Sequence, residues 1–228
     1  SLPSRGLGDV YKRQAIDVDR TSGLFSDITL NGDGVGTAFT THHGRSADSL
    51  VVDRLNVSGY SVGVSLHSDL GEISAPLILR EAHVMVSSAL ATESYPVRLE
   101  SSQLVGALDL AQTTVHSVDG QVGSVTVGEG GEYSAFKTVT LDARRNGLPV
   151  PALFDVSYGD DLLSPFSVEG TTVDVELLLR TVIEDSEGVA NQWAVQATVT
   201  GSPVAQLVVD SPTTSSAVSY THLTLPTT

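Results

Sequence analysis

The chain contains the stretch FSDITLNGDGVGTAFTTHHG at residues 25–44, and a similar stretch, VVDRLNVSGYSVGVSLHSDLG, occupies residues 51–71. Apolar residues and one glycine coincide when the two are aligned: Ile28 falls on Leu55, Leu30 on Val57 and Gly32 on Gly59. Each stretch consists of a short apolar strand, a turn of small residues and a second short strand. Recurrence of such a unit predicts a repeat architecture.

Two further copies extend the repeat. LREAHVMVSSALATESYPVRLESS begins at Leu79; in it Val84 matches Val57, and YPVRLE takes the place of the VGVSL of residues 62–66. LAQTTVHSVDGQVGSVTVGEGG covers residues 110–131, with valines before and after its turn. The copies are spaced by about 25 to 31 residues, within the range of solenoid repeats.

Stacking explains why such units would recur. A pair of strands this short cannot bury its inner face alone, whereas stacked units form a continuous apolar column. We therefore expect Ile28, Leu55, Val84 and Val115 to share one column. The pattern resembles the right-handed parallel β-helix family, and this resemblance covers about half of the chain and rests on periodicity. A β-sandwich is the alternative, because short strands at this spacing also suit one.

A different pattern follows residue 132. An alternating strand at Val139–Ala143 and a second strand at Ala152–Ser157 enclose Arg145-Asn146-Gly147, and Asn-Gly between apolar runs favours a hairpin. TLDARRNGLPVPALFDV resembles the opening hairpin of carboxypeptidase-regulatory-like and Ig-like modules, although a bulkier residue stands where those modules place a glycine. The resemblance implies a small Ig-like β-sandwich.

The predicted fold class is therefore all-β, with a short right-handed parallel β-helix over residues 15–132 and an Ig-like sandwich over 133–214. Val, Ile and Thr, which suit pleated surfaces, are frequent throughout. We expect Trp193 to anchor the core of the sandwich. Its further strands are predicted at Thr172–Thr181, Trp193–Val199 and Ala205–Val209.

The two ends of the chain differ from the rest. GATGTGTATAAGAGACAG is one way to encode DVYKRQ at residues 9–14, and its reverse complement, read from the third base, encodes the VSYTH of residues 218–222. This word resembles the transposase mosaic end used to build sequencing libraries. We therefore expect residues 1–14 and 215–228 to be translated adapter without function. The authentic part would then be an internal fragment, with any signal peptide or anchor outside it.

The composition restricts the partners. The net charge is −15, and Lys137 is the only lysine outside the adapter-like ends. Such a surface argues against nucleic acid and against anionic membranes, whose phosphates need Lys and Arg. It fits an exported prokaryotic protein in a salty medium, such as that of a marine archaeon. There is no cysteine, and no run approaches the roughly 18 apolar residues that would insert in a membrane.

Acidic turns are weak candidates for structural Ca²⁺, because calcium takes oxygen ligands. None has the spacing of an EF-hand or of the nonapeptide calcium repeat, and tight turns require the same residue types. No other cofactor is expected. The calcium candidates are Asp27, Asn31, Asp33, Asp160, Asp161, Asp185 and Glu187.

Histidines and scattered carboxylates are the remaining candidates for chemistry. His42 and His43 are adjacent and would point to opposite faces of a strand, whereas stacking could bring His43 near His67. THHG faintly resembles the Gly-His-Gly of some pectin-degrading hydrolases, but the paired Asp motif of those enzymes is absent. No catalytic residue is assigned. The unassigned charged and histidine residues are Asp17, Asp19, Asp53, Arg54, His83 and His116.

The function expected from these features is that of a fragment of an extracellular or cell-surface structural or adhesive protein. Its β-helix stalk would contact carbohydrate or other surface proteins, an expectation that comes from the family resemblance. The alternative is a polysaccharide lyase or glycoside hydrolase of β-helix type. A cleft lined by three carboxylates close to one another would favour this alternative. A calcium-stabilised adhesin array is the third possibility.

Overall fold

The structure is a computed structural model that describes residues 14–19, 23–42, 49–68, 75–145, 148–158, 164–184, 186–189, 192–199, 202–210 and 221–224. These residues form strands and turns, and none of them lies in a helix. In this part of the chain there is accordingly no helix that could cross a membrane. The prediction of an all-β protein is confirmed, with a large, mostly parallel sheet and a small antiparallel one.

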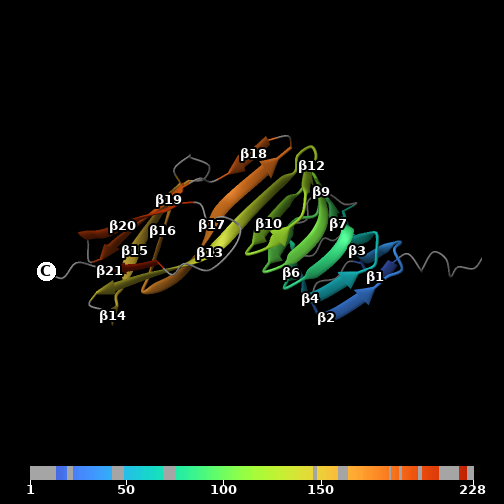
Figure 1. Cartoon of the computed structure of the whole chain (residues 1–228), viewed down its shortest axis with the longest axis horizontal. Helices are drawn as coiled ribbons and strands as arrows, with labels where there is room; N and C mark the ends of the chain where they lie inside the picture. Colours follow the sequence, from blue (N-terminus) through green and yellow to red (C-terminus); the bar gives the residue numbers. More distant parts are fainter. Residues whose placement is uncertain are drawn as a thin grey trace, which may run out of the picture. The chain divides into compact units, whose positions relative to one another are not determined.

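The chain divides into two compact units. The first comprises Ser1–Ala135 and Val182–Glu187, and the second comprises Phe136–Thr181 and Gly188–Thr228. Figure 1 shows the strands of residues 14–127, coloured from blue to green, lying side by side. Its strands are β1 (Gln14–Asp19), β2 (Gly23–Asn31), β3 (Thr37–His42), β4 (Leu50–Ser58), β5 (Val62–His67), β6 (Leu77–Arg80), β7 (His83–Glu93), β8 (Val97–Glu100), β9 (Gln103–Ala111), β10 (Thr114–Val118), β11 (Gln121–Val122), β12 (Val125–Val127) and the first half of β18 (Ser186–Val189), which ends in the second unit.

Strands β1 to β12 pair in three parallel ladders. The first ladder joins the first halves of β2 and β4 to β6, β8 and β10. The second joins the second halves of β2 and β4 to the first halves of β7 and β9 and to β11. The third joins β1, β3 and β5 to the second halves of β7 and β9 and to β12. The chain therefore returns to each ladder once per repeat.

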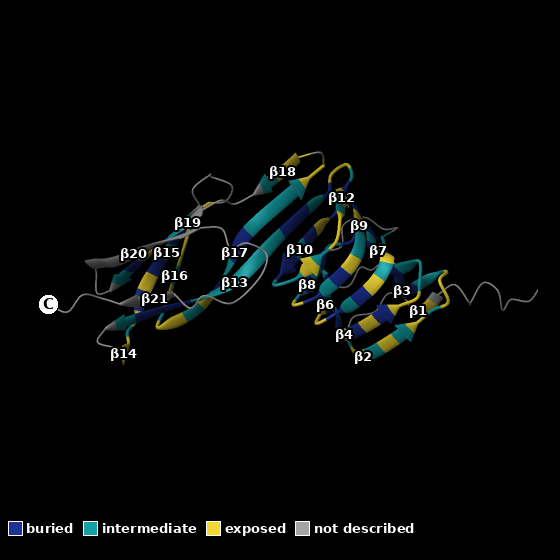
Figure 2. Cartoon of the chain, in the orientation of Figure 1, coloured by how far each residue is buried: buried dark blue, intermediate teal, exposed yellow. Residues whose placement is uncertain are grey.

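Equivalent apolar positions line up along each ladder and form the core of this unit. In the second ladder Leu30, Val57, Val84, Leu104 and Val122 are in register. Figure 2 shows buried and exposed bands alternating along β4, β7 and β9, as expected where one face of a strand packs inward. The corresponding row of the first ladder is Leu50, Leu77, Val97 and Val115, and that of the third is Ile16, Phe39, Val64, Leu90, Leu108 and Val125.

The alignment of the first two copies is confirmed residue by residue: Ile28 pairs with Leu55 and Leu30 with Val57. The two aligned glycines are in close contact, since a Cβ on Gly32 would lie 2.3 Å from the carbonyl oxygen of Gly59. Glycine is required there because the backbones approach too closely for any side chain.

The expected single column is wrong in its later members. Val84 stands in the second ladder beside Val57, whereas Val115 stands in the first beside Val97. Likewise, the YPVRLE strand does not take the place of residues 62–66; those residues pair with Ser88–Thr92 of β7.

A shortening of the repeat explains these errors. Side chains that meet across adjacent repeats are 27 residues apart at Asp27 and Arg54, 20 apart at Arg80 and Glu100, and 18 apart at Ser94 and Gln112. Longer connections follow β3 and β5, whereas only Ser94–Pro96 separate β7 from β8. An alignment with a constant period therefore slips after β7.

Left-handed residues mark the corner between the first and second ladders. Asp27 has a φ of 58° and Arg54 a φ of 54°, and the equivalent residue of each following repeat has a similar value. Non-glycine residues adopt this conformation uncommonly, so its recurrence indicates that the repeat geometry imposes it. The later members of the row are Glu81, Ser101 and Asp119.

The second unit contains the predicted hairpin. Arg145 pairs antiparallel with Leu148, and Arg144 with Pro149, as the two arms of a hairpin do. Residues 146–147 lie outside the described residues. The strands that carry this unit are β13 (Glu132–Arg145), which begins in the first unit, β14 (Leu148–Pro149), β15 (Ala152–Tyr158), β16 (Phe166–Gly170), β17 (Thr172–Ile183), which ends in the first unit, β19 (Gln192–Val199), β20 (Ser202–Asp210) and β21 (Thr221–Thr224).

A small antiparallel sheet, in the order β16-β15-β19-β20, accompanies the pair β13 and β17 in this unit. Side chains from both sets of strands form one core, including Leu141 of β13, Phe154 of β15, Leu177 of β17 and Val195 of β19. The side chain of Trp193, the expected anchor, lies outside the described residues. Strand β21 falls in the adapter-like tail and pairs parallel with Leu141–Arg144.

Candidate functional site

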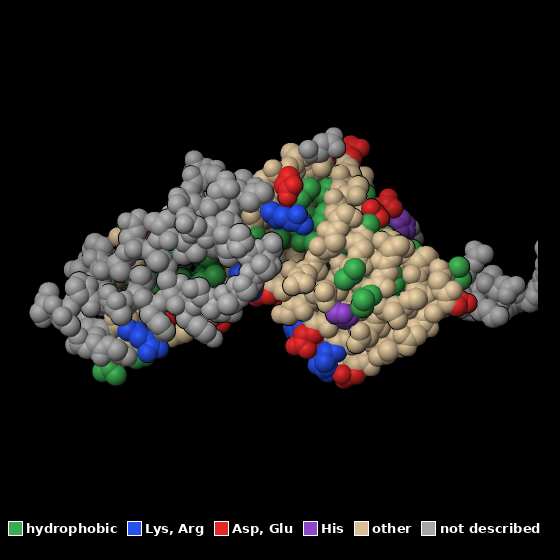
Figure 3. Space-filling model, viewed as in Figure 1, with side chains coloured by type: hydrophobic (Ala, Val, Ile, Leu, Met, Phe, Trp, Pro, Cys, Tyr) green, Lys and Arg blue, Asp and Glu red, His purple; other side chains and the backbone are tan. Residues whose placement is uncertain are grey.

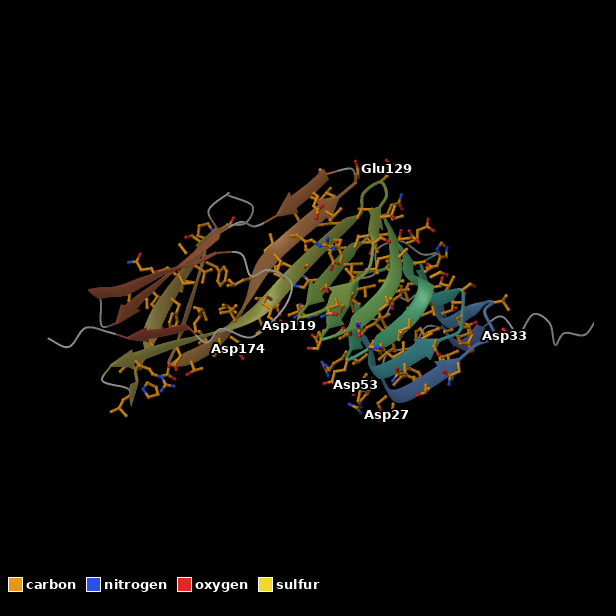
Figure 4. The ribbon with its side chains drawn as sticks, in the orientation of Figure 1. Asp27, Asp33, Asp53, Asp119, Glu129 and Asp174 are labelled. Atoms are coloured by element: carbon orange, nitrogen blue, oxygen red, sulfur yellow. The ribbon has the colours of Figure 1, made fainter. Side chains whose placement is uncertain are left out.

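Charged side chains of the first unit gather at the corner between the first and second ladders, which we call the charged corner. Figure 3 shows acidic and basic side chains together at one edge of this unit, and in Figure 4 Asp27 and Asp53 lie close to each other there. Much of the remaining visible face of the unit consists of other side chains and backbone. The charged corner comprises Asp27, Asp53, Arg54, Arg80, Arg98 and Glu100.

Arg54 links two carboxylates of this corner. Its Nε donates to Oδ1 of Asp27 at 2.7 Å and its Nη2 donates to Oδ2 at 3.0 Å, while Nη1 donates to Asp53. The hydrogen bond from Arg54 lowers the pKa of Asp27, and the same bond raises the pKa of Arg54. Both members of the pair therefore stay charged over the physiological pH range.

Glu100 receives two guanidinium groups from consecutive repeats. Arg98 Nε donates to Oε1 at 2.8 Å, and Arg80 Nε donates to Oε2 at 2.9 Å. These contacts lower the pKa of Glu100, with the hydrogen bond from Arg98 as the largest cause. A carboxylate held in this way is a poor general acid, because its proton is lost well below neutral pH. The contacts of the charged corner therefore tie successive repeats together.

Hydroxyl groups tie repeats together at other positions. Ser61 Oγ donates to the carbonyl of Gly36 at 2.9 Å, and Ser87 Oγ donates to the carbonyl of Ser61 at 2.9 Å. Ser58 Oγ donates to Asn31 Oδ1 at 2.8 Å. Each bond joins equivalent regions of adjacent repeats, so polar side chains reinforce the parallel ladders.

No known protein family, curated protein or solved structure matches this chain. The arrangement of its own residues is therefore the basis for any functional conclusion.

The calcium candidates do not come together in the part of the chain that the structure describes. Asp27 pairs with Arg54, Asn31 accepts from Ser58, and Asp33 is exposed in a bend that Figure 4 shows at a different edge of the unit from Asp27. Glu187 is an exposed residue of β18. Among the described side chains, no group of three or more His, Asp or Glu could hold a metal ion. Asp160, Asp161 and Asp185 lie outside the described residues.

The histidines occupy different rows. His67 pairs in register with His42. The reason is the register of β3 with β5, which pairs Phe39 with Val64 and therefore His42 with His67. His43, which we expected near His67, lies outside the described residues. His67 Nδ1 lies 3.2 Å from Glu93 Oε2. His83 is in register with Gln103, and His116 with Arg98.

Sequence reasoning missed most of the charged corner. The sequence patterns single out none of Arg80, Arg98 and Glu100, and they assign no role to Asp53 and Arg54. A signal existed, because the offset that places Ile28 on Leu55 also places Asp27 on Arg54. Opposite charges at equivalent positions of adjacent repeats predict such a contact.

Proposed function

We propose that the first unit is a right-handed parallel β-helix. The three parallel ladders support this, because the chain visits them in the same order in every repeat. Right-handedness is the expected sense, since connections between parallel strands of one sheet are almost always right-handed. The rows of buried Leu and Val along each ladder would form the interior of the coil.

The second unit is, in this proposal, an Ig-like β-sandwich. Its support is the shared core of β13 and β17 with β15 and β19, together with the Arg145–Leu148 hairpin. Sandwiches bury the inner faces of two sheets against each other in this way.

The proposed role is that of a structural or adhesive segment of an exported surface protein. The observation that carries it is the cross-repeat pairing of polar side chains, in which Arg54 binds Asp27 and Arg80 binds Glu100. Such contacts stiffen a stack along its axis, as a presenting or spacing element requires. Carbohydrate or another surface protein would be the partner, and the acidic surface makes neutral glycans more suitable than acidic ones.

A deletion tests the stacked repeats. Removing Ser94–Ala111 takes out one whole 18-residue repeat and joins Glu93 to Gln112, which is equivalent to Ser94. We expect this variant to unfold cooperatively, with a moderately lower melting temperature, because the ladders re-form in phase. The matched control removes Ser94–Leu110, one residue fewer, which would turn every following side chain to the other face. If both deletions fold equally well, or neither folds, the β-helix proposal is wrong.

The role is tested with purified chain and polysaccharides. A glycan array should show binding to neutral glycans that is lost after heat denaturation. Incubation with the bound polysaccharide should release neither reducing ends nor unsaturated products. Turnover of any polysaccharide would instead establish the lyase or hydrolase alternative, and an absence of glycan binding would remove carbohydrate as the partner.

A further inference from the structure

The outer face of the second ladder consists of two rows of residues that include no Asp, Glu, Lys or Arg. These residues stand on either side of the buried row that contains Val57 and Val84, so their side chains point away from the interior. We call the two rows the neutral face. The first row is Thr29, Asn56, His83, Gln103 and Gln121, and the second is Asn31, Ser58, Met85 and Val105.

The neutral face contrasts with the rest of this chain, whose net charge is −15. Charged side chains of the same unit gather instead at the charged corner, where the strands of the second ladder begin. Figure 3 shows hydrophobic and histidine side chains of the first unit among uncharged side chains and backbone, with charged side chains toward the edges. Electrostatic complementarity on the neutral face therefore favours a partner without charge.

The side chains of the neutral face combine amides with a small apolar patch. The side chains of Thr29 and Asn56 are exposed and make no hydrogen bond among the described residues. An amide both donates and accepts hydrogen bonds, as the hydroxyl groups of a sugar do. Met85 and Val105 are in register and are 54% and 46% exposed, so they offer an apolar surface to the C–H groups of a sugar ring.

The neutral face is long and narrow. Its first row crosses five strands, β2, β4, β7, β9 and β11, and at about 4.7–4.9 Å per strand it extends over about 19 Å. Polar groups recur at each strand along this length. Such an array fits an extended polymer better than a single small molecule.

Other macromolecules fit the neutral face less well. Nucleic acids and acidic polysaccharides need Lys or Arg, and neither residue occurs in the two rows. Protein interfaces are enriched in aromatic side chains and Arg, whereas the apolar residues of these rows are Met85 and Val105 alone.

We infer that the neutral face binds a segment of a neutral polysaccharide. Asn56 and Gln103 contribute hydrogen bonds to its hydroxyl groups, and Met85 and Val105 pack against its C–H groups. This inference rests on the proposed carbohydrate-binding role and adds the surface that performs it.

The test is binding of the full chain to insoluble cellulose, chitin and mannan, with polygalacturonate as the acidic comparison. The wild type should bind at least one of the three neutral polymers and should not bind polygalacturonate. Asn56→Ala/Met85→Ala should weaken binding at least tenfold, because it removes one polar and one apolar contact. Sodium chloride should change the affinity little, because no ion pair forms.

The matched control is Thr114→Ala/Thr126→Ala, which truncates two exposed side chains in the first and third ladders. It should bind as tightly as the wild type, and circular dichroism should show that both double variants are folded. Unchanged binding by Asn56→Ala/Met85→Ala, or an equal loss in the control, would overturn the inference and leave the proposed role standing. A wild type that binds none of the neutral polymers would overturn both. Self-association that Asn56→Ala/Met85→Ala abolishes, without glycan binding, would assign the neutral face to a protein contact instead.

Discussion

Arg54 and Asp27 are 27 residues apart in the chain, yet they meet through two parallel hydrogen bonds at equivalent corners of adjacent repeats. Both residues have left-handed backbones, with φ values of 54° and 58°. One guanidinium thus bridges two repeats and also contacts the neighbouring Asp53. Because Arg54 contacts two carboxylates and Asp27 contacts one guanidinium, we expect the two residues to contribute unequally to the stability of the first unit.

Arg54→Ala should destabilise the first unit more than Asp27→Ala does. Loss of Asp27 leaves an exposed arginine that water solvates, whereas loss of Arg54 leaves the largely buried Asp53 carboxylate without its cation. Thermal melts of the two variants, with Asp33→Ala as an exposed control, measure the order. Equal melting temperatures for the Arg54 and Asp27 variants would contradict it.

Glu100 should contribute to stability in a pH-dependent way. Its pKa is lowered in the folded state from an ordinary value of 4.5, so its contribution is present above that value and is lost as the pH falls through the folded pKa. Urea unfolding of wild type and Glu100→Gln between about pH 5 and about pH 3 should therefore give a steeper loss for the wild type. Arg98→Gln should flatten the profile in part. Parallel profiles for all three proteins would show that the ion pairs do not form in solution.

Leu99→Ala should test the burial of a second row of the first ladder, in which Leu79 and Leu99 are in register. Leu99 is in register with Leu79 and fully buried, so its truncation leaves a cavity and should cost about 2–5 kcal/mol of unfolding free energy. Met85→Ala is the control, because Met85 is 54% exposed on β7, and its cost should stay within about 0.5 kcal/mol. Denaturant unfolding measures both, and similar costs would place Leu99 outside the core.

Gly32→Ala should be destabilising for steric reasons alone. A Cβ there would lie 2.3 Å from the Gly59 carbonyl oxygen, so backbones must move apart at a cost of about 1–3 kcal/mol. In Gly128→Ala the nearest atom, the Leu110 carbonyl oxygen, would be 3.3 Å away, and the change should cost less. The comparison requires only equilibrium melts, and a reversed order would mean that the two repeats do not stack at Gly32.

Deletion of residues 215–228 should leave the stability of the second unit unchanged within about 0.5 kcal/mol, because we interpret this tail as translated adapter. The structure pairs β21 of the tail with β13, which makes the experiment informative. Denaturant unfolding of full and truncated chains is the measurement. A clear loss of stability would show that the tail belongs to the fold, and the adapter interpretation would then be wrong.

Local pattern predicted the parts of the fold in which the repeat length is constant. The matches of Ile28 with Leu55 and of Val57 with Val84 are confirmed because the same offset holds across β2, β4 and β7. Beyond β7 the connections shorten, and periodicity places Val115 in the wrong ladder because it carries no information about the length of a connection. For the same reason, the repeat period alone does not predict the third ladder, in which His42 and His67 are in register.

The first repeat shows what a further repeat would do. Phe25, Ile28 and Leu30 of β2 are only partly buried, whereas their register partners Val52, Leu55 and Val57 on β4 are buried completely or nearly so. In the described part of the chain, each layer thus completes the burial of the one before it, and the same main-chain bonds that attach one layer can attach the next. In the proposed β-helix, duplication of a single gene segment would therefore lengthen the protein without any newly evolved interface, and its length would be set by whatever shields the outermost layer.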